Sequence, residues 1–207
     1  MVEIDVAYPG EPIYPAICRF AQDIYLTEHG AYIDPSPDLF AYALFENCLV
    51  GCLGLSCAKG RTLLLFETYV PSAYVRLSGS SHPDRKELAE IGTRVVELPS
   101  AATVRSIDVS VALTAALLCD AYRLGIRYVG FTTTKLVRHI TEPLGFTLVN
   151  LGEPDLSGKD SAFRLNWQNF FRVPQMCAGF CISSLEGCET EIRRLRDRGV
   201  LVRNRHL

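Results

Sequence analysis

Two apolar stretches joined by a two-residue turn constrain the fold of this chain more than any other feature of its sequence. The segment Phe40–Phe45 is followed by Glu46-Asn47 and then by Cys48–Cys57, which is rich in leucine, valine and cysteine. A connection this short is typical of an antiparallel hairpin. A second turn at Lys59-Gly60 leads into Thr62–Val70, which we predict as a third strand. An antiparallel sheet is therefore expected in the first half of the chain.

An alternation of strands and helices follows these hairpins. A fourth strand is predicted at Glu87–Glu97, and the apolar residues of Asp108–Leu124 repeat with helical spacing. Short apolar strands at Tyr128–Thr132 and Phe146–Leu151 flank a predicted helix at Lys135–Leu144. This order indicates parallel strands joined by a helical crossover within an otherwise antiparallel sheet. We predict an α/β fold whose mixed, mostly antiparallel central sheet is flanked by helices.

The two ends of the chain complete this outline. Residues Met1–Tyr14 carry two prolines and are predicted as an extended arm, and Ile13–Tyr25 has the apolar spacing of a helix. Phe163–Ile182 is expected to contain one more strand and an aromatic turn. We predict a single domain over residues 1–188. Residues 189–207 hold six arginines and three acids, and are predicted as a basic C-terminal tail or helix.

Composition and charge exclude several classes of protein. The 207 residues carry 21 Lys and Arg against 23 Asp and Glu, a net charge of −2, which excludes binding of nucleic acid through overall charge. The first residues carry acids and no apolar stretch reaches the length of a membrane span. The eight cysteines have no zinc-site spacing. We therefore expect a cytoplasmic protein with no membrane span, no metal and no nucleic-acid partner.

A series of short motifs resembles the thermostable hemolysin family, distant relatives of acyl-homoserine lactone synthases. The resemblance runs from about Ile13 to Ile182 and is carried by Leu65–Val70, Ala89–Gly92, Val129–Thr134, Val137-Arg138, Leu144–Phe146 and Trp167–Phe171. It implies a GNAT-like acyltransferase fold, in which a parallel strand pair splays apart around the pantetheine arm of an acyl thioester. The Gly-rich loop of acetyl-CoA-binding relatives is absent before Asp108, which indicates a larger donor, and Thr93-Arg94 stand where the family tends to carry Asn-Leu.

Two glutamates are the candidate catalytic residues. Amide formation from a thioester requires an amine to lose a proton, and burial raises a carboxyl pKa towards neutrality. Glu90 lies among apolar residues and is predicted as the general base or amine-positioning acid; a salt bridge with Arg94 is the alternative. Glu67 is predicted to face the acceptor amine from its strand, and a solvent-facing edge charge is the alternative.

The donor is expected to lie between two walls, Glu90–Arg94 and Gly130–Thr134, as the resemblance implies. A phosphate is expected at the N-terminus of the predicted helix that begins at Asp108, where helix dipole and free amides attract anions, although Asp108 itself competes. The alternatives are surface arginines, and threonines that serve β-propensity and helix capping. The predicted thioester- and cofactor-binding residues are Ile91, Arg94, Arg105, Ser106, Thr132, Thr133, Thr134 and Arg138.

Aromatic residues are predicted to line an acyl pocket, with core packing as the alternative. These residues are Phe131, Trp167 and Phe170. The predicted function is transfer of an acyl group from acyl-CoA or the phosphopantetheine of acyl carrier protein to the amine of an amino acid or amino-acid-derived metabolite, in specialised biosynthesis or signalling. An acidic carrier protein is expected to dock on the Arg-rich C-terminal segment. The alternatives are an autoinducer-type synthase that uses S-adenosylmethionine, and a non-catalytic, lytic protein that kept the fold.

Overall fold

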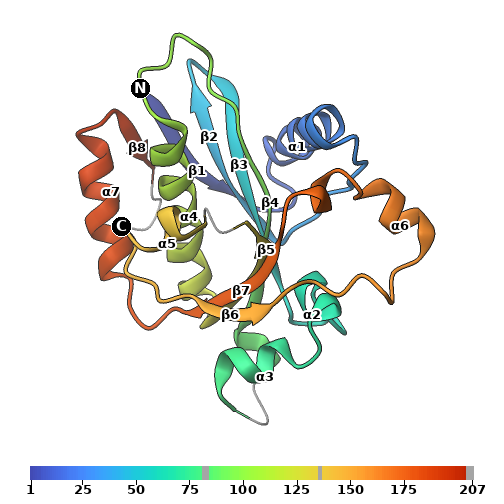
Figure 1. Ribbon diagram of the computed structural model, residues 1–207. Coiled ribbons are helices and arrows are strands. Elements are labelled where there is room, and N and C mark those ends of the chain that lie inside the picture. The colour runs from blue at the N-terminus through green and yellow to red at the C-terminus, as the bar shows by residue number, and fades with distance from the viewer. Residues whose placement is uncertain (81–83, 135–136, 204–207) are drawn as a thin grey trace.

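One twisted sheet organises the molecule (Figure 1). The computed structural model of the chain describes residues 1–80, 84–134 and 137–203. Within these ranges eight strands pair in the order β6-β7-β5-β4-β3-β2-β1-β8. The strands are β1 Val2–Ala7, β2 Leu39–Phe45, β3 Cys48–Cys57, β4 Leu88–Val96, β5 Tyr128–Thr133, β6 Val149–Gly152, β7 Met176–Cys181 and β8 Val200–Val202. Neighbouring strands are antiparallel except β4 with β5 and β1 with β8, so the predicted α/β fold with a mixed, mostly antiparallel sheet is confirmed.

Helices cover both faces of the sheet (Figure 1). The longest is α4, which connects β4 to the parallel strand β5 and is buried along most of its length, as expected of a helix apolar nearly all round. On its outer side α4 packs against α7. The helices are α1 Tyr14–His29, α2 Leu65–Tyr69, α3 Ala73–Ser78, α4 Ser106–Arg123, α5 Arg138–Thr141, α6 Ser161–Asn166 and α7 Glu186–Arg196. The apolar residues of α2 and α3 share a separate cluster on the sheet, and those of α1 share another.

The parallel pair is joined over only a short length. Leu88, Ala89 and Glu90 pair with β5, and the last pair is Glu90 with Gly130. Beyond that pair β4 runs on to Val96 and β5 to Thr133 without pairing to each other. The two strands therefore diverge from Glu90 onwards.

A bulge in β4 lies just beyond this point. The pairing of β4 with β3 shifts register between Cys52 and Gly54, opposite Thr93. Thr93 has a φ of 53°, a left-handed conformation that a β-branched residue adopts only under strain. Bulges bend a strand and re-aim its side chains, and they are common beside active sites. The bulge thus lies in the part of β4 that runs on beyond its pairing with β5.

Two sequence predictions about secondary structure are wrong. The predicted third strand at Thr62–Val70 is a loop followed by the short helix α2. Two carboxylates stabilise the start of this helix. Glu67 and Glu90 accept hydrogen bonds from the backbone N–H groups of its first turn, which have no partner within the helix. The predicted arm Met1–Tyr14 contains β1, which pairs antiparallel with β2, a strand some forty residues later in the chain.

Other elements are found with altered bounds. The predicted first helix extends to His29 and ends at Gly30, which has a φ of 63°. Of the helix predicted at Lys135–Leu144, residues 135–136 lie outside the described residues and α5 covers a central turn. The strand predicted to start at Phe146 starts at Val149, since the Phe146 ring turns into the core and stacks on Phe180 with 4.6 Å between ring centroids. The C-terminal segment forms most of α7 and then β8, which pairs with β1.

The described helices include none that is long and apolar enough to cross a bilayer.

Substitution of Gly130 tests the packing of α2 against the parallel strands β4 and β5. A Cβ at Gly130 would overlap the ring of Phe66, which is fully buried. We expect Gly130→Ala to lower the free energy of unfolding by about 1–3 kcal/mol, as overpacking does. Gly92→Ala is the matched control, because a Cβ at that glycine meets nothing within 4 Å. Urea unfolding measures both, and equal stability of the two variants would contradict the packing described.

Candidate active site

Glu90 stands where β4 and β5 part. Its carboxylate accepts hydrogen bonds from the backbone N–H groups of Leu65 at 2.7 Å and Phe66 at 3.1 Å. Burial raises the pKa of Glu90 from its ordinary 4.5 to about 7, the two amides oppose this, and the charge of Glu67 adds to it. Each carboxylate oxygen has a second lone pair. The Glu90 carboxyl group is therefore fixed in place and can exchange a proton near neutral pH. The alternative prediction, a salt bridge between Glu90 and Arg94, is wrong, because these two residues form no ion pair.

Glu67 is buried in an ion pair. Its two oxygens accept from Arg85 at 2.7 and 2.9 Å, and one of them also accepts from the backbone N–H of Leu64 at 2.8 Å. The expected strand setting is wrong because the residue lies on α2, and the alternative of a solvent-facing charge is wrong too. Glu67 thus acts on the site through α2 and through the pKa of Glu90.

The diverging strands enclose a cleft with a volume of about 310 Å³. Seven of the residues predicted to bind the donor or its acyl group line this cleft: Ile91, Arg94, Phe131, Thr132, Thr133, Thr134 and Phe170. Leu53, Phe180 and Ile140 add an apolar floor on the α4 side. One wall is therefore rich in hydroxyl groups and the floor is apolar, which suits an arm with a polar backbone and an apolar end.

A groove of about 420 Å³ lies beside the cleft. Glu90 lines this groove together with Asp34, Arg61 and Trp167, so Trp167 lies in the groove and not in the cleft with Phe131 and Phe170. Gly92 and Thr93 of the bulge line both spaces. A molecule in the groove and one in the cleft would therefore meet at the bulge, close to the Glu90 carboxyl group.

A third space of about 490 Å³ extends the cleft to the N-terminus of α4. Arg94, Thr133 and Thr134 line both the cleft and this space, and Ser106 lines its far end. Nη1 of Arg94 donates to Oγ of Ser110 at 3.3 Å, which holds the guanidinium against α4. The structure thus places Arg94 in the cleft and Ser106 in the space that extends it.

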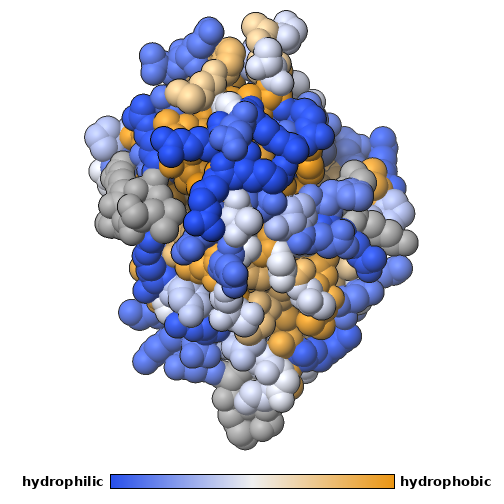
Figure 2. All heavy atoms as spheres, turned by 90° about the vertical axis from the view of Figure 1, so that its left-hand side faces the viewer, coloured by the Kyte–Doolittle hydropathy of each residue, from blue (hydrophilic) through white to orange (hydrophobic). Residues whose placement is uncertain are grey.

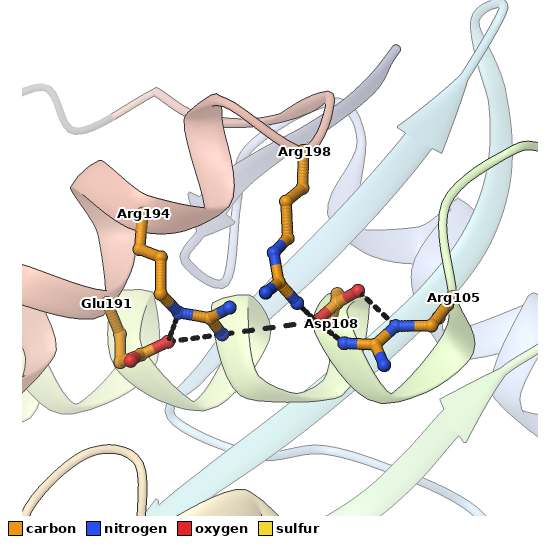
Figure 3. A network of polar contacts seen from close by, with 5 residues as sticks. All are labelled: Arg105, Asp108, Glu191, Arg194 and Arg198. Carbon is orange, nitrogen blue, oxygen red and sulfur yellow. Dashed lines mark hydrogen bonds and ion pairs between the residues drawn. The ribbon is translucent and has the colours of Figure 1, made fainter.

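Two predicted donor-binding arginines point elsewhere. Arg105 donates to the buried carboxylate of Asp108 at 2.7 and 2.8 Å, on the side of α4 that faces α7 (Figure 3). Arg198 at 3.4 Å and Arg194 at 4.0 Å converge on the same carboxylate, and these arginines hold the pKa of Asp108 below its ordinary value. The carboxylate of Asp108 is therefore paired with arginines of this chain, and Arg105 is engaged in that pairing. Arg138 is exposed on α5 and lines none of the three spaces.

Several residues of the site have no sequence signal of their own. Tyr25 and His29, one turn apart at the end of α1, line the cleft and contact Trp167 and Phe170 with ring centroids 5.9 and 5.7 Å apart. Their spacing of four residues on a predicted helix was the only available hint. Gln175, which also lines the cleft, was missed entirely. In the part of the chain that is described, no group of three or more His, Cys, Asp or Glu side chains is arranged to hold a metal ion.

The pH dependence of stability tests the environment of Glu90. Between pH 4.5 and about 7 the folded protein keeps a proton on Glu90 that the unfolded chain releases. Stability then falls as the pH rises through this window, because the folded state binds more protons. We expect the stability of Glu90→Gln to lose this fall with rising pH. The control Glu153→Gln changes an exposed carboxyl group in a loop, and we expect its stability to fall with pH as that of the wild type does. Urea unfolding at a series of pH values measures the slopes; the same slope for wild type and Glu90→Gln would be the contrary result.

The comparisons with known proteins agree with this geometry. The family model described as "Thermostable hemolysin" matches residues 7–184. No curated protein sequence matches the chain. Among solved structures, a CoA-dependent acyl-homoserine lactone synthase, BjaI, with SAM and isopentyl-CoA is similar with a TM-score of 0.66 and 18% identity, over 100% of this chain and 96% of that one.

Two further solved structures share the fold. The AHL synthase LasI is similar with a TM-score of 0.62 and 10% identity, over 99% of each chain. FeeM, an N-acyl amino acid synthase from uncultured soil microbes, is similar with a TM-score of 0.60 and 15% identity, over 87% of this chain and 97% of that one. At these identities the likeness establishes the fold, and the predicted relationship to acyl-homoserine lactone synthases is confirmed at that level.

Proposed function

This chain belongs to the thermostable hemolysin family, and we propose that it is an acyltransferase acting from an acyl thioester. The donor is acyl-CoA or the phosphopantetheine of acyl carrier protein, and the acceptor is the amine of an amino acid or amino-acid-derived metabolite. One observation carries the proposal: a cleft opens between parallel strands just beyond the Glu90–Gly130 pair, and the groove beside it is lined by Glu90, whose pKa burial raises to about 7. An ammonium group must lose a proton before its nitrogen can attack, and a carboxyl group with a pKa near the working pH can accept that proton.

The donor's arm lies between β4 and β5 in this proposal. Beyond Glu90 the edge of β4 that faces β5 has no strand partner, so the amides of an extended arm can pair with it as an added strand would. Thr132, Thr133 and Thr134 line the opposite wall. The phosphate end of the donor reaches the space at the N-terminus of α4, which Ser106 and Arg94 line and where the helix dipole favours an anion. The acyl chain enters the apolar floor under Phe131 and Phe170.

The acceptor occupies the groove on the Glu90 side. Glu90 takes a proton from the ammonium group, and the free amine attacks the thioester carbonyl carbon. Backbone groups of the bulge at Gly92 and Thr93, which line both spaces, stabilise the oxyanion that forms. The carbon–sulfur bond then breaks, and Glu90 returns its proton to the thiolate, which leaves as a thiol. The nitrogen releases its second proton to solvent, and the product is the neutral amide. No covalent acyl-enzyme forms.

Carrier protein would approach from the side of α7. Arg105, Arg194 and Arg198 gather around one carboxylate near the N-terminus of α4, next to the space that ends at Ser106 (Figure 3). Figure 2 shows hydrophilic side chains gathered on this face of the molecule. Three arginines around one carboxylate on this face favour a partner with acidic residues.

A thiol-release assay tests the proposed reaction. Acyl-CoAs and acyl carrier proteins are offered with a panel of amino acids, and the acylated amine is identified by mass spectrometry. We expect Glu90→Gln to lower kcat by about 10²- to 10⁴-fold, the usual contribution of general base catalysis, with donor binding retained. Glu153→Gln is the control, because this exposed residue lines none of the three spaces, and we expect it to keep wild-type rates.

Two other outcomes would replace this proposal. Release of methylthioadenosine from S-adenosylmethionine, dependent on the acyl donor, would assign an autoinducer-type synthase. Silence with every donor, together with membrane lysis that persists in Glu90→Ala, would assign a non-catalytic protein that kept the fold.

A further inference from the structure

Gln175 carries a buried polar atom that no group in the protein satisfies. The residue precedes β7 and is 9% exposed. Its Nε2 donates to the backbone carbonyl of Phe170 at 3.1 Å, which fixes the orientation of the amide. Its Oε1 has no hydrogen-bond partner, and within the described residues the only other such buried side-chain atom is Nε of Arg85. An unsatisfied buried acceptor is destabilising, so this oxygen is suited to accept a hydrogen bond from a bound ligand.

Gln175 stands on the wall of the cleft at a defined distance from its reacting end. Gln175 lines the cleft and does not line the groove. Met176 pairs with Thr133, so Gln175 stands level with Thr134, four residues beyond the Glu90–Gly130 pair. At about 3.3 Å per residue this places it about 13 Å along the strands towards the wide end of the cleft. Gln175 is thus too far from Glu90 to meet the acceptor amine, and it lies beside the path of the donor's arm.

We propose that Gln175 is a positioning residue for the acyl donor, and that its Oε1 accepts a hydrogen bond from an amide N–H of the pantetheine arm. This inference rests on the proposed function. The N-terminus of α4 and the threonine-lined wall offer hydrogen-bond donors to the phosphate and carbonyl groups of such an arm, whereas an amide N–H of the arm needs an acceptor. Gln175 supplies one on the wall opposite β4. Because its Nε2 also holds the carbonyl of Phe170, the same amide links the arm to the aromatic turn beside the cleft.

The test compares ligands that differ in one atom. The parent ligand is a non-reactive thioether analogue of acyl-pantetheine, and in two further ligands each amide N–H is replaced in turn by an ester oxygen. Calorimetry measures their binding to the wild type, to Gln175→Met and to the control Gln168→Met, which alters an exposed glutamine near the same turn. We expect the wild type and Gln168→Met to bind one of the ester ligands about tenfold more weakly than the parent, the worth of one buried hydrogen bond.

Variants of Gln175 distinguish a direct contact with the ligand from a purely structural role of this residue. We expect Gln175→Met to bind that ester and the parent within twofold of each other, and Gln175→Glu, which keeps an acceptor oxygen, to discriminate again. A merely structural role would weaken all three ligands alike. Equal binding of the three ligands by the wild type, or undiminished discrimination by Gln175→Met, would overturn the inference and leave the proposed function standing. Failure of the wild type to bind the parent ligand would overturn both.

Discussion

The carboxylate of Glu90 joins three parts of this structure. It belongs to the last residue of β4 that pairs with β5, and it accepts hydrogen bonds from the first two backbone N–H groups of α2. It also lines the groove, which shares Gly92 and Thr93 with the cleft. Without those two hydrogen bonds a helix of five residues has little reason to form, since so short a segment gains nothing from helix propagation. The place where the sheet opens and the place where a proton can be held are therefore the same.

The surroundings of Glu90 set its charge. Arg85 neutralises the neighbouring Glu67, so two carboxyl groups coexist at the foot of α2. Burial favours the protonated form of Glu90 and the two amides favour the carboxylate. The balance lies near neutrality, where a carboxyl group both accepts and returns a proton. Phe66, packed on Gly130, holds α2 in the position from which those amides reach Glu90.

Local patterns predicted the parts of the fold that are locally determined. The turn at Glu46 and Asn47, both with positive φ, suits a two-residue hairpin and placed β2 beside β3. The position of the cleft followed from family resemblance. Neither α2 nor β1 was predictable in this way, because α2 depends on a carboxylate from another strand and β1 on a partner far along the chain. The role of Gln175 was equally hidden, since an unsatisfied oxygen exists only once the side chains are packed.

The central claim is that the parting of β4 and β5 makes a slot for a thioester arm, with Glu90 at its inner end. A crystal structure of the protein with a non-reactive thioether analogue of acyl-CoA tests this most directly. The account predicts the arm between the two strands, its sulfur beside Glu90 and its phosphates at the N-terminus of α4. An arm bound on another surface, or strands paired along their full length with the carboxyl group turned to solvent, would contradict it.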